Sequence, residues 1–388
     1  MISLSTVESL LEKVIQPAVQ DQFTKKALLY QIAKKNFGIS NWAGDKFFIP
    51  VRVQRFPGVI ALPDGAPLLH GEASYQQAKA SVKLLTGSTE IDKKVLAVKD
   101  SASVVPLLTR ISEDLTNDLI MDINRQLFGT GDGVIGTASA NGSSTTTLTV
   151  SASLNGDTTA EDVITPGQYI KIGSGSANKV VSVSGNTVVL TTAQSWSSSA
   201  SIYKVTATGL TSDELSGLGL LFNNSATYLN IDPSTYPVWK AVVDTPTGAT
   251  TVLNLPDTHK NYVTANKVGD VKYIFMNRTL FQKYGSILEA NVRFEPKSVL
   301  GGGWKGLDYM GGQAQVVLDY NTPDDWVVML SPKMLTLGEL QPLQFEQGTD
   351  GRLLRKAGYM NYEIVLAGLM ELATFSRAAH ACLKKRVA

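Results

Sequence analysis

The sequence predicts an α+β protein built from several parts. Three observations predict this class: one long amphipathic helix, one long hairpin with alternating apolar residues, and one charge-poor segment with a series of short strand patterns. The chain has 388 residues, of which 43% are hydrophobic. Because a chain of this length can form two or three domains with cores of their own, the fold needs neither a disulfide nor a metal ion.

Charge and cysteine content restrict the classes of function. The formal net charge is +1, whereas a protein held to DNA by its surface charge carries a basic excess. We therefore expect any contact with nucleic acid to be weak and non-specific. The single cysteine, Cys382, excludes an internal disulfide and a multi-cysteine metal site. The sequence shows neither a secretory signal nor a run of about 18 apolar residues, so we expect no membrane span.

Residues 5–37 are predicted to form a helix that is interrupted once. Ser5 and Glu8 have the spacing of a capping box, in which each side chain bonds the backbone N–H of the other residue. Pro17 ends the first apolar stripe, because proline removes a donor and clashes with the preceding turn. Two interpretations are open: a packed helical pair, or an arm that docks on another subunit.

Residues 46–98 are predicted to form one long β-hairpin. The residues from 46 to 62 alternate between apolar and polar, a tip rich in proline and glycine follows, and extended sequence resumes from Tyr75 to about Leu96. A hairpin alone in water is marginally stable. We therefore expect it to lie on its own domain or on a neighbouring molecule.

Residues 103–128 form the clearest helix of the sequence. Apolar residues recur there every three or four positions, and Gly129 follows as a C-terminal glycine. The composition then changes: between Gly131 and Thr208, 27 of 78 residues are Ser or Thr and seven are charged. Short strands are predicted at 145–150, 167–172, 179–184, 186–191 and 201–206. We interpret this segment as a small inserted β-domain, since its valine-rich runs argue against a disordered linker.

The remaining sequence mixes helices and strands. Strands are predicted at 273–276, 315–318 and 326–330, and Asn277 is expected to cap a helix that follows the first of them. Extended segments are expected from residue 353 onward. The stretch Met370–Leu383 has the propensity of a helix.

No pattern in the sequence predicts a catalytic site. The three histidines, His70, His259 and His380, lie far apart and are interpreted as surface or hydrogen-bonded residues. The zinc-protease, nucleophile-elbow and P-loop motifs are absent. Clusters of glycine at 129–133 and 301–303 are interpreted as turns.

Two weaker hypotheses concern ligands. Asp324 and Asp325, or Asp319 with either of them, could bind a divalent cation, although adjacent acids in a loop are usually solvated. Aromatic and basic residues of the hairpin could stack on single-stranded nucleic acid; they are Arg52, Arg55 and Phe56.

Four blocks of sequence carry a resemblance to a known family. The first runs from Gln22 to Lys35 and continues from Gly44 to Arg52; the others run from Asp118 to Gly133, from Gly301 to Asp319, and from Asp350 to Lys384. In this order along the chain they resemble the major capsid proteins of tailed bacteriophages, which have the Hong Kong 97-type fold. The resemblance covers most of 1–133 and 209–388, and the inserted β-domain lies outside it.

The resemblance implies a division of the chain. The parts are an N-terminal arm (1–45), an extended loop hairpin (46–98), the spine helix of a peripheral domain (99–133), an inserted β-domain (134–208), an axial domain (209–342) and return strands of the peripheral domain (343–388).

The resemblance also implies a function. It implies a head protein without enzymatic activity, cofactor or metal ion, which assembles in the host cytoplasm into the hexamers and pentamers of an icosahedral virion shell around double-stranded DNA. A separate scaffolding protein and a portal are the expected partners, a decoration protein is left open, and no membrane is involved. Two other shell or virion roles stay open: an encapsulin-like nanocompartment, and a β-rich tail or host-binding protein. A hydrolase that uses the loop acids is a more distant alternative.

Contacts between subunits are expected where the loop crosses a neighbour. The candidates are the loop residues Arg52, Arg55 and Phe56 and the helix residues Glu113, Asp114, Asp118 and Asp122. Some relatives form a covalent crosslink between a loop lysine and an asparagine near a glutamate. The corresponding candidates here are Lys79 or Lys83 with Asn361 and Glu363.

Overall fold

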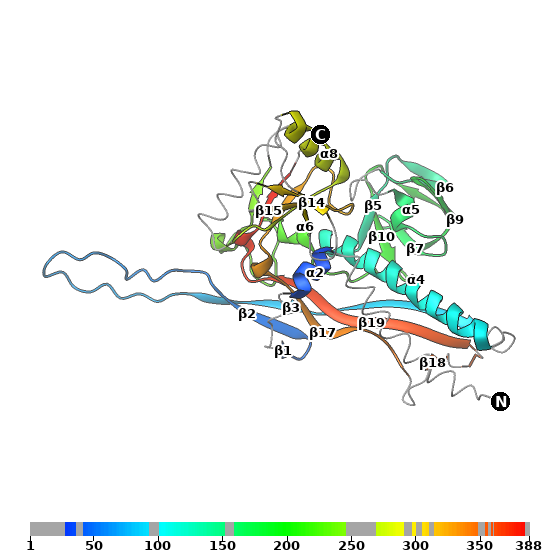
Figure 1. Cartoon of the computed structure of the whole chain (residues 1–388), viewed down its shortest axis with the longest axis horizontal. Helices are drawn as coiled ribbons and strands as arrows, with labels where there is room; N and C mark the ends of the chain where they lie inside the picture. Colours follow the sequence, from blue (N-terminus) through cyan, green and yellow to red (C-terminus); the bar gives the residue numbers. More distant parts are fainter. Residues whose placement is uncertain are drawn as a thin grey trace.

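The computed structural model is an elongated molecule in which a two-stranded ribbon projects from a flat base and two compact bodies stand on that base (Figure 1). No helix in the described ranges is long and apolar enough to cross a membrane. The structure describes residues 28–35, 42–92, 101–151, 159–245, 269–290, 297–299, 305–309, 314–347, 354–355, 358–359 and 361–384.

The base is a four-stranded sheet, the spine sheet. Its central strand, β19, lies antiparallel to the other three strands. Helix α4 covers one face: a side chain at Gly87 would come within 3.1 Å of Leu115 on this helix. The strands are β4 (Lys83–Asp92), β17 (Leu335–Phe345), β18 (Leu354–Arg355) and β19 (Asn361–Thr374).

Helix α4 (Ser101–Phe128) confirms the helix predicted at 103–128 and begins two residues earlier. Its apolar residues form one stripe because they recur at the helical period, and this stripe joins the main core of the molecule. The buried members of the stripe are Leu119, Ile120, Ile123, Leu127 and Phe128.

The ribbon consists of β2 (Lys46–Arg52) and β3 (Tyr75–Ser81), which pair antiparallel, with the short strand β1 (Trp42–Ala43) beside β2. The ribbon is therefore shorter than the hairpin predicted at 46–98. Strand β4 leaves it after Val82 and pairs along ten residues with β19. The reason is burial: Leu85 and Ile91 become buried only in a sheet that a helix covers.

Residues 134–205 form a small β-barrel. Six strands pair in the order β5-β10-β7-β8-β9-β6, and a bridge between Ala138 and Val150 joins the first strand to the last. Its apolar core is separate from the main core. The elements are β5 (Val134–Thr137), β6 (Gly142–Thr149), α5 (Ala160–Val163), β7 (Tyr169–Ile172), β8 (Asn178–Ser184), β9 (Thr187–Trp196) and β10 (Ser201–Val205).

The second body on the base contains a seven-stranded mixed sheet, the upper sheet, with helix α8 (Arg278–Ala290) beside it. The turns η2 (Pro332–Met334) and η3 (Arg377–Ala379) connect it to the spine sheet, and α6 (Leu218–Leu221) and η1 (Pro237–Trp239) lie between the barrel and β11. Its strands, in sheet order, are β11 (Val242–Asp244), β20 (Ala381–Leu383), β16 (Val327–Leu330), β12 (Tyr273–Met276), β15 (Ala314–Leu318), β14 (Lys305–Tyr309) and β13 (Lys297–Val299).

The helix predicted for Met370–Leu383 is wrong. This stretch holds the end of β19, the turn η3 and strand β20. Residues 370–374 are fully buried in the spine sheet, where β17 pairs with them, so pairing with a distant strand outweighs their helical propensity. The same pairing places residues 335–342 in the spine sheet, although the sequence assigned them to the axial domain, and places β20 in the upper sheet.

Little of the predicted N-terminal arm lies within the described residues. Helix α2 (Leu28–Lys35) packs against β17, where the hydroxyl of Tyr30 donates to the Glu339 carboxylate at 2.7 Å. Helix α2 therefore packs within its own chain, as the first of the two interpretations of residues 5–37 expects. The helix predicted from residue 5 to residue 27 lies outside the described residues.

Candidate assembly surfaces

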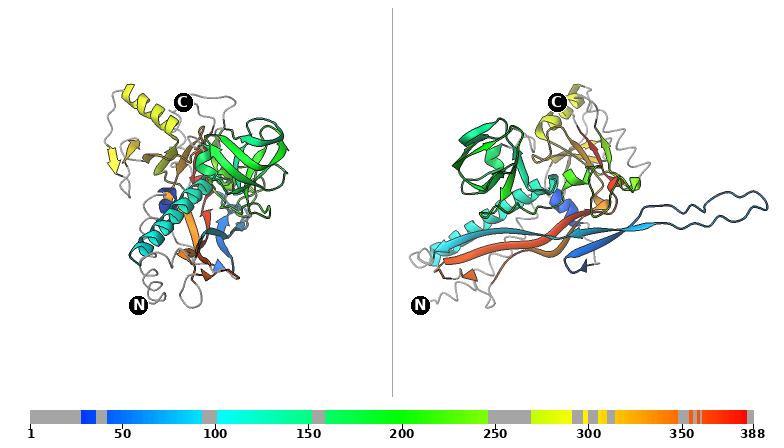
Figure 2. Two further views of the ribbon diagram at one scale, coloured as in Figure 1. Left: turned by 90° about the vertical axis from the view of Figure 1, so that its right-hand side faces the viewer. Right: turned by 180° about the vertical axis from the view of Figure 1, so that it is seen from behind.

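The tip of the ribbon, residues 53–74, is the largest exposed apolar segment of the described chain. Its backbone hydrogen bonds stay within the ribbon, and the right-hand view of Figure 2 shows it projecting away from the rest of the molecule. Val59 is 86% exposed and Leu68 is 71% exposed. The exposed apolar side chains of the tip are Phe56, Val59, Ile60, Leu62, Leu68 and Leu69.

Two glycines let the limbs of the tip pack closely. A Cβ atom at Gly58 would lie 2.5 Å from the carbonyl oxygen of Leu69, and one at Gly71 would lie 2.2 Å from the Pro57 ring. The limbs therefore form a defined ribbon that turns its apolar side chains to solvent. Burying one such side chain stabilises a protein by about 1.5–3 kcal/mol, so a contiguous exposed set indicates a contact surface.

The three loop candidates lie together at the start of the tip. The Arg52 Nε donates to the carbonyl oxygen of Gln54 at 3.2 Å, and its guanidinium carbon lies 5.2 Å from the centre of the Phe56 ring. Arg55 is exposed. Arg52 and Phe56 thus shape the loop itself, and the contact of these residues with a neighbouring subunit stays a prediction.

The four acidic candidates on α4 divide into two groups. Asp114 and Asp118 are exposed and Glu113 is half-buried, whereas Asp122 points toward the β-barrel. The Asp122 carboxylate lies 3.1 Å from the Lys204 ammonium and 3.1 Å from the Arg125 guanidinium. Burial would raise the pKa of Asp122, but these two cations lower it to about 2. Asp122 therefore has partners within its own chain.

Asp122 belongs to a buried ion network at the junction of helix and barrel, which we call the junction network (Asp122, Arg125, Lys204 and Glu214). Arg125 binds both carboxylate oxygens of Glu214, a fork geometry, and the Glu214 side chain is only 1% exposed. Burial lowers the pKa of Arg125, and the two carboxylates more than offset this, so its pKa is raised. The network joins α4, β10 of the barrel and the segment after the barrel.

That segment, residues 211–217, is the strap. Its Asp213 carboxylate pairs with Lys83 of β4, and its Ser216 N–H donates to Glu371 of β19 at 2.8 Å. Together with Glu214, these contacts fix the strap to the helix and to two strands of the spine sheet. Sequence patterns missed the strap, because its partners lie far away along the chain.

The histidines and loop acids form no centre in the described part of the chain. His380 is buried, with its ring nitrogens near the Ser331 N–H and the Thr374 hydroxyl, and burial lowers its pKa to about 4. The Asp319 carboxylate accepts from Asn124 and the Asp324 carboxylate from Asn277. Among the described residues, no three His, Cys, Asp or Glu side chains lie close enough to hold a metal ion. His70 is exposed, and His259 lies outside the described residues.

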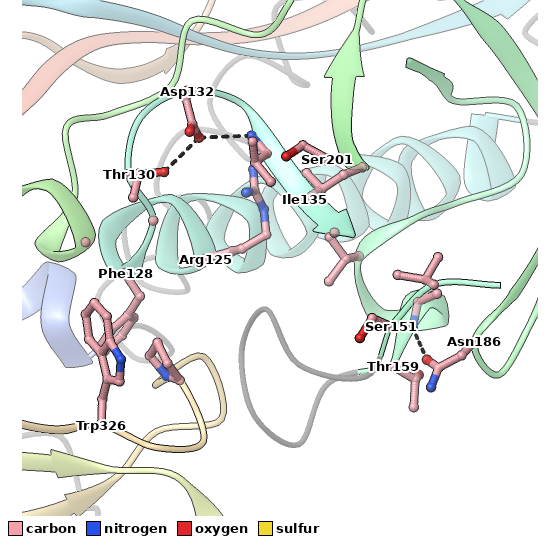
Figure 3. A pocket seen from close by; sticks show the side chains of 18 of the residues that line it. Arg125, Phe128, Thr130, Asp132, Ile135, Ser151, Thr159, Asn186, Ser201 and Trp326 are labelled. Atoms are coloured by element: carbon pink, nitrogen blue, oxygen red, sulfur yellow. Dashed lines mark hydrogen bonds between the residues drawn. The ribbon is translucent and has the colours of Figure 1, made fainter. Parts of the chain in front are cut away.

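A hollow of about 410 Å³ lies where α4, the barrel and the loop before β16 meet (Figure 3). Phe128, Ile135 and Trp326 contribute to its lining. Two further lining residues, Ser151 and Thr159, flank residues 152–158, which lie outside the described residues. We therefore assign no ligand to it.

The crosslink candidates are separated within one subunit. The pairing of β4 with β19 places Lys83 opposite Met370, and Asn361 lies nine residues earlier on β19. At roughly 3.3 Å per residue this is about 30 Å. Lys79 lies with its ammonium 5.9 Å from the Phe48 ring centre. A crosslink between two subunits stays untested.

The arrangement of ribbon, spine and upper sheet can be compared with solved structures. The capsid of cyanophage A-1(L) matches with a TM-score of 0.56 at 14% sequence identity, over 94% of this chain and 93% of that chain. Mycobacterium phage Bobi matches with a TM-score of 0.48 at 8% identity, over 100% and 99% of the chains. The SrpI encapsulin complex of Synechococcus elongatus matches with a TM-score of 0.46 at 9% identity, over 96% and 89%.

The first of these matches spans nearly all of both chains. The chain has the Hong Kong 97-type capsid fold. No protein-family model and no curated protein matches the sequence. The sequence resemblance leads us to expect that the ribbon is the extended loop of this fold and that α4 is its spine helix.

Proposed function

We propose that the protein is the major capsid protein of a tailed bacteriophage, a structural and not a catalytic subunit. It assembles into the hexamers and pentamers of an icosahedral shell. The observation that carries this proposal is the ribbon tip. Its exposed apolar side chains have no apolar partner in the described part of their own chain, and they project beyond the base.

A closed shell gives these side chains a partner. Each copy in a shell contacts several others at slightly different angles, so a ribbon that reaches over a neighbour supplies contact area without one rigid angle. The Hong Kong 97-type fold of the cyanophage A-1(L) capsid supports this role, because that structure is a capsid subunit. Virion location, host-cytoplasmic assembly, a separate scaffolding protein and a portal follow as parts of the same proposal.

The cargo is proposed to be double-stranded DNA. A net charge of +1 favours loose packing of DNA over tight binding. A nanocompartment shell of the same fold encloses proteins instead. The contents of purified particles therefore distinguish the two. A capsid should contain nuclease-resistant DNA, seen as a raised ratio of nucleic-acid to protein absorbance. A nanocompartment should contain protein cargo without nucleic acid.

The shell role can be tested by substituting two exposed apolar side chains of the ribbon tip. In the variant Val59→Asp with Leu68→Asp, we expect an unchanged melting temperature of the unassembled subunit, because neither side chain belongs to its core. Shell yield, measured by sedimentation and electron microscopy with scaffolding protein added, should fall at least about tenfold, since each subunit loses two buried contacts.

The matched control is Val181→Asp, an exposed valine of the β-barrel. This control should assemble like the unchanged protein. A wild-type chain that stays monomeric at high concentration with and without scaffolding protein would contradict the shell role. Normal assembly of the tip variant would contradict the role of the ribbon.

A further inference from the structure

The outer face of the β-barrel carries an ordered set of tyrosines and lysines. Strand pairing places Lys179 opposite Tyr169, and Lys171 opposite Tyr203, on three neighbouring strands. Alternate residues of these strands, such as Ile170 and Ile202, fill the barrel core. The tyrosines and lysines therefore point outward. We call these four residues the Tyr–Lys face.

The Tyr–Lys face carries two of the three lysines of the barrel. The third lysine of the barrel, Lys204, pairs with Asp122 of the junction network. Neither Lys171 nor Lys179 has a carboxylate partner in the described part of the chain, and the Lys171 ammonium lies 5.4 Å from the Tyr203 ring centre. The face is thus basic and aromatic.

The carboxylates in and beside the described barrel are used elsewhere. Asp132 accepts from Thr130 and from the Val134 N–H. Asp162 caps α5, and Glu161 accepts the N–H of Gly185 in the hairpin turn between β8 and β9. Each of these acids therefore stabilises a turn, and none of them pairs with Lys171 or Lys179.

We propose that the Tyr–Lys face binds an acidic polysaccharide. The flat side of a tyrosine ring packs against the C–H groups of a sugar ring, while its hydroxyl bonds a sugar hydroxyl. Two ammonium groups match the carboxylates that such a polymer carries at intervals. Lys171 and Lys179 are diagonal neighbours on adjacent strands, which places them roughly 7–8 Å apart.

Other partners fit this face less well. Protein interfaces are depleted of lysine. Nucleic acid carries a phosphate at every nucleotide, whereas residues 131–208 hold only three lysines beside four acids. Strand addition is excluded at the closed part of the barrel, because the bridge between its first and last strands leaves no free edge there.

The experiment uses the unassembled full-length chain, so its outcome does not depend on shell formation. Binding to immobilised polygalacturonate, a carboxylated polysaccharide, is measured beside neutral dextran and single-stranded oligo(dT). We expect binding to polygalacturonate alone. The variant Lys171→Gln with Lys179→Gln should bind at least about tenfold more weakly, the equivalent of two exposed charge contacts.

Two further variants test the geometry. Lys46→Gln with Lys240→Gln removes the same charge from exposed positions elsewhere and should bind like the unchanged chain. Tyr203→Leu keeps the charge and should still lose affinity, which simple charge attraction would not predict. Equal melting temperatures verify that the barrel is folded in each variant. The proposal is overturned by no binding, by equal binding of dextran, by preference for oligo(dT), or by equal loss in the Lys46 and Lys240 control.

Discussion

Glu371 lies in the centre of the spine sheet with 2% of its surface exposed. Burial raises the pKa of this carboxyl group to about 8, although it accepts the N–H groups of Ser216 and Leu372. The folded protein therefore keeps a proton that the unfolded chain releases at its ordinary pKa of about 4.5. Between these two values, folding is linked to proton uptake.

This linkage predicts a pH dependence of stability. The contribution of Glu371 is fully present below about pH 4.5 and is lost as the pH rises through about 8, because the folded form binds the extra proton in that interval. We expect the free energy of unfolding, relative to that of Glu371→Gln, to fall by roughly 1 kcal/mol per pH unit in this range. Urea unfolding of both proteins from pH 5 to 8 checks it, and parallel curves would contradict it.

The exposure of single acidic residues on α4 could not be predicted from the sequence. Asp118 and Asp122 are four residues apart on a helix, which places both on one face, and the sequence gives no sign that only Asp118 is exposed. The difference comes from Lys204 and from Glu214, which lies 89 residues from Arg125. Local spacing predicts the face of a helix, but a distant chain segment decides what covers that face.

At the level of elements, local patterns predicted local structure. Helix α4 and the barrel strands at 179–184 and 186–191 were predictable, since the apolar period of each lies within one short segment of the chain. Strand β4 and the end of β19 were assigned wrongly, because their pairing partners lie elsewhere in the sequence. The course of the ribbon and the contacts of the strap depend on the position of β19, which local sequence patterns do not show.

The inserted barrel is expected to be separable from the rest. Its core shares no residue with the main core, and the Lys204 N–H donates to the Gly133 carbonyl at 3.0 Å, so the two chain connections lie side by side. Replacing residues 134–208 by a short Gly/Ser linker should leave a folded subunit whose melting temperature falls by only a few degrees, because a short loop costs little entropy to close. Circular dichroism and thermal unfolding measure this.

A longer deletion is the control for that experiment. Extending it through Glu214 leaves Arg125 buried without its main partner, which costs about 3–5 kcal/mol and should prevent stable folding. If the shorter deletion also gives only insoluble protein, the barrel is not an independent unit. If both fold equally well, the junction network contributes little.

For the whole molecule, the order of sequence blocks predicted the fold that the solved structures confirm. The contact partners between subunits remain predictions, because a single chain holds no partner. Loop residues Arg52 and Arg55 are expected to meet the acids Asp114 and Asp118 of a neighbouring α4. Such exposed pairs contribute about 0.2–1 kcal/mol each, repeated at every interface of a shell.

The variant Arg52→Glu with Arg55→Glu should therefore melt within about a degree of the unchanged subunit, since exposed substitutions shift stability by no more than about 0.5 kcal/mol. Shell yield should drop severalfold and recover in high salt, which screens the new repulsion. Calorimetry of the unassembled variant and microscopy of assembly reactions give the two values. Equal shell yield, or a large loss of subunit stability, would show that the arginines have another role.

The continuity of the ribbon with the spine sheet has a mechanical consequence. Strand β3 passes through the single residue Val82 into β4, and β4 is hydrogen-bonded to β19 along ten residue pairs. A tension applied at the ribbon tip thus pulls β4 lengthwise past β19. Loaded in this direction, the ladder shares the force among all its hydrogen bonds at once, whereas a perpendicular pull would break them one by one. A lattice of such subunits would resist outward pressure through its backbone.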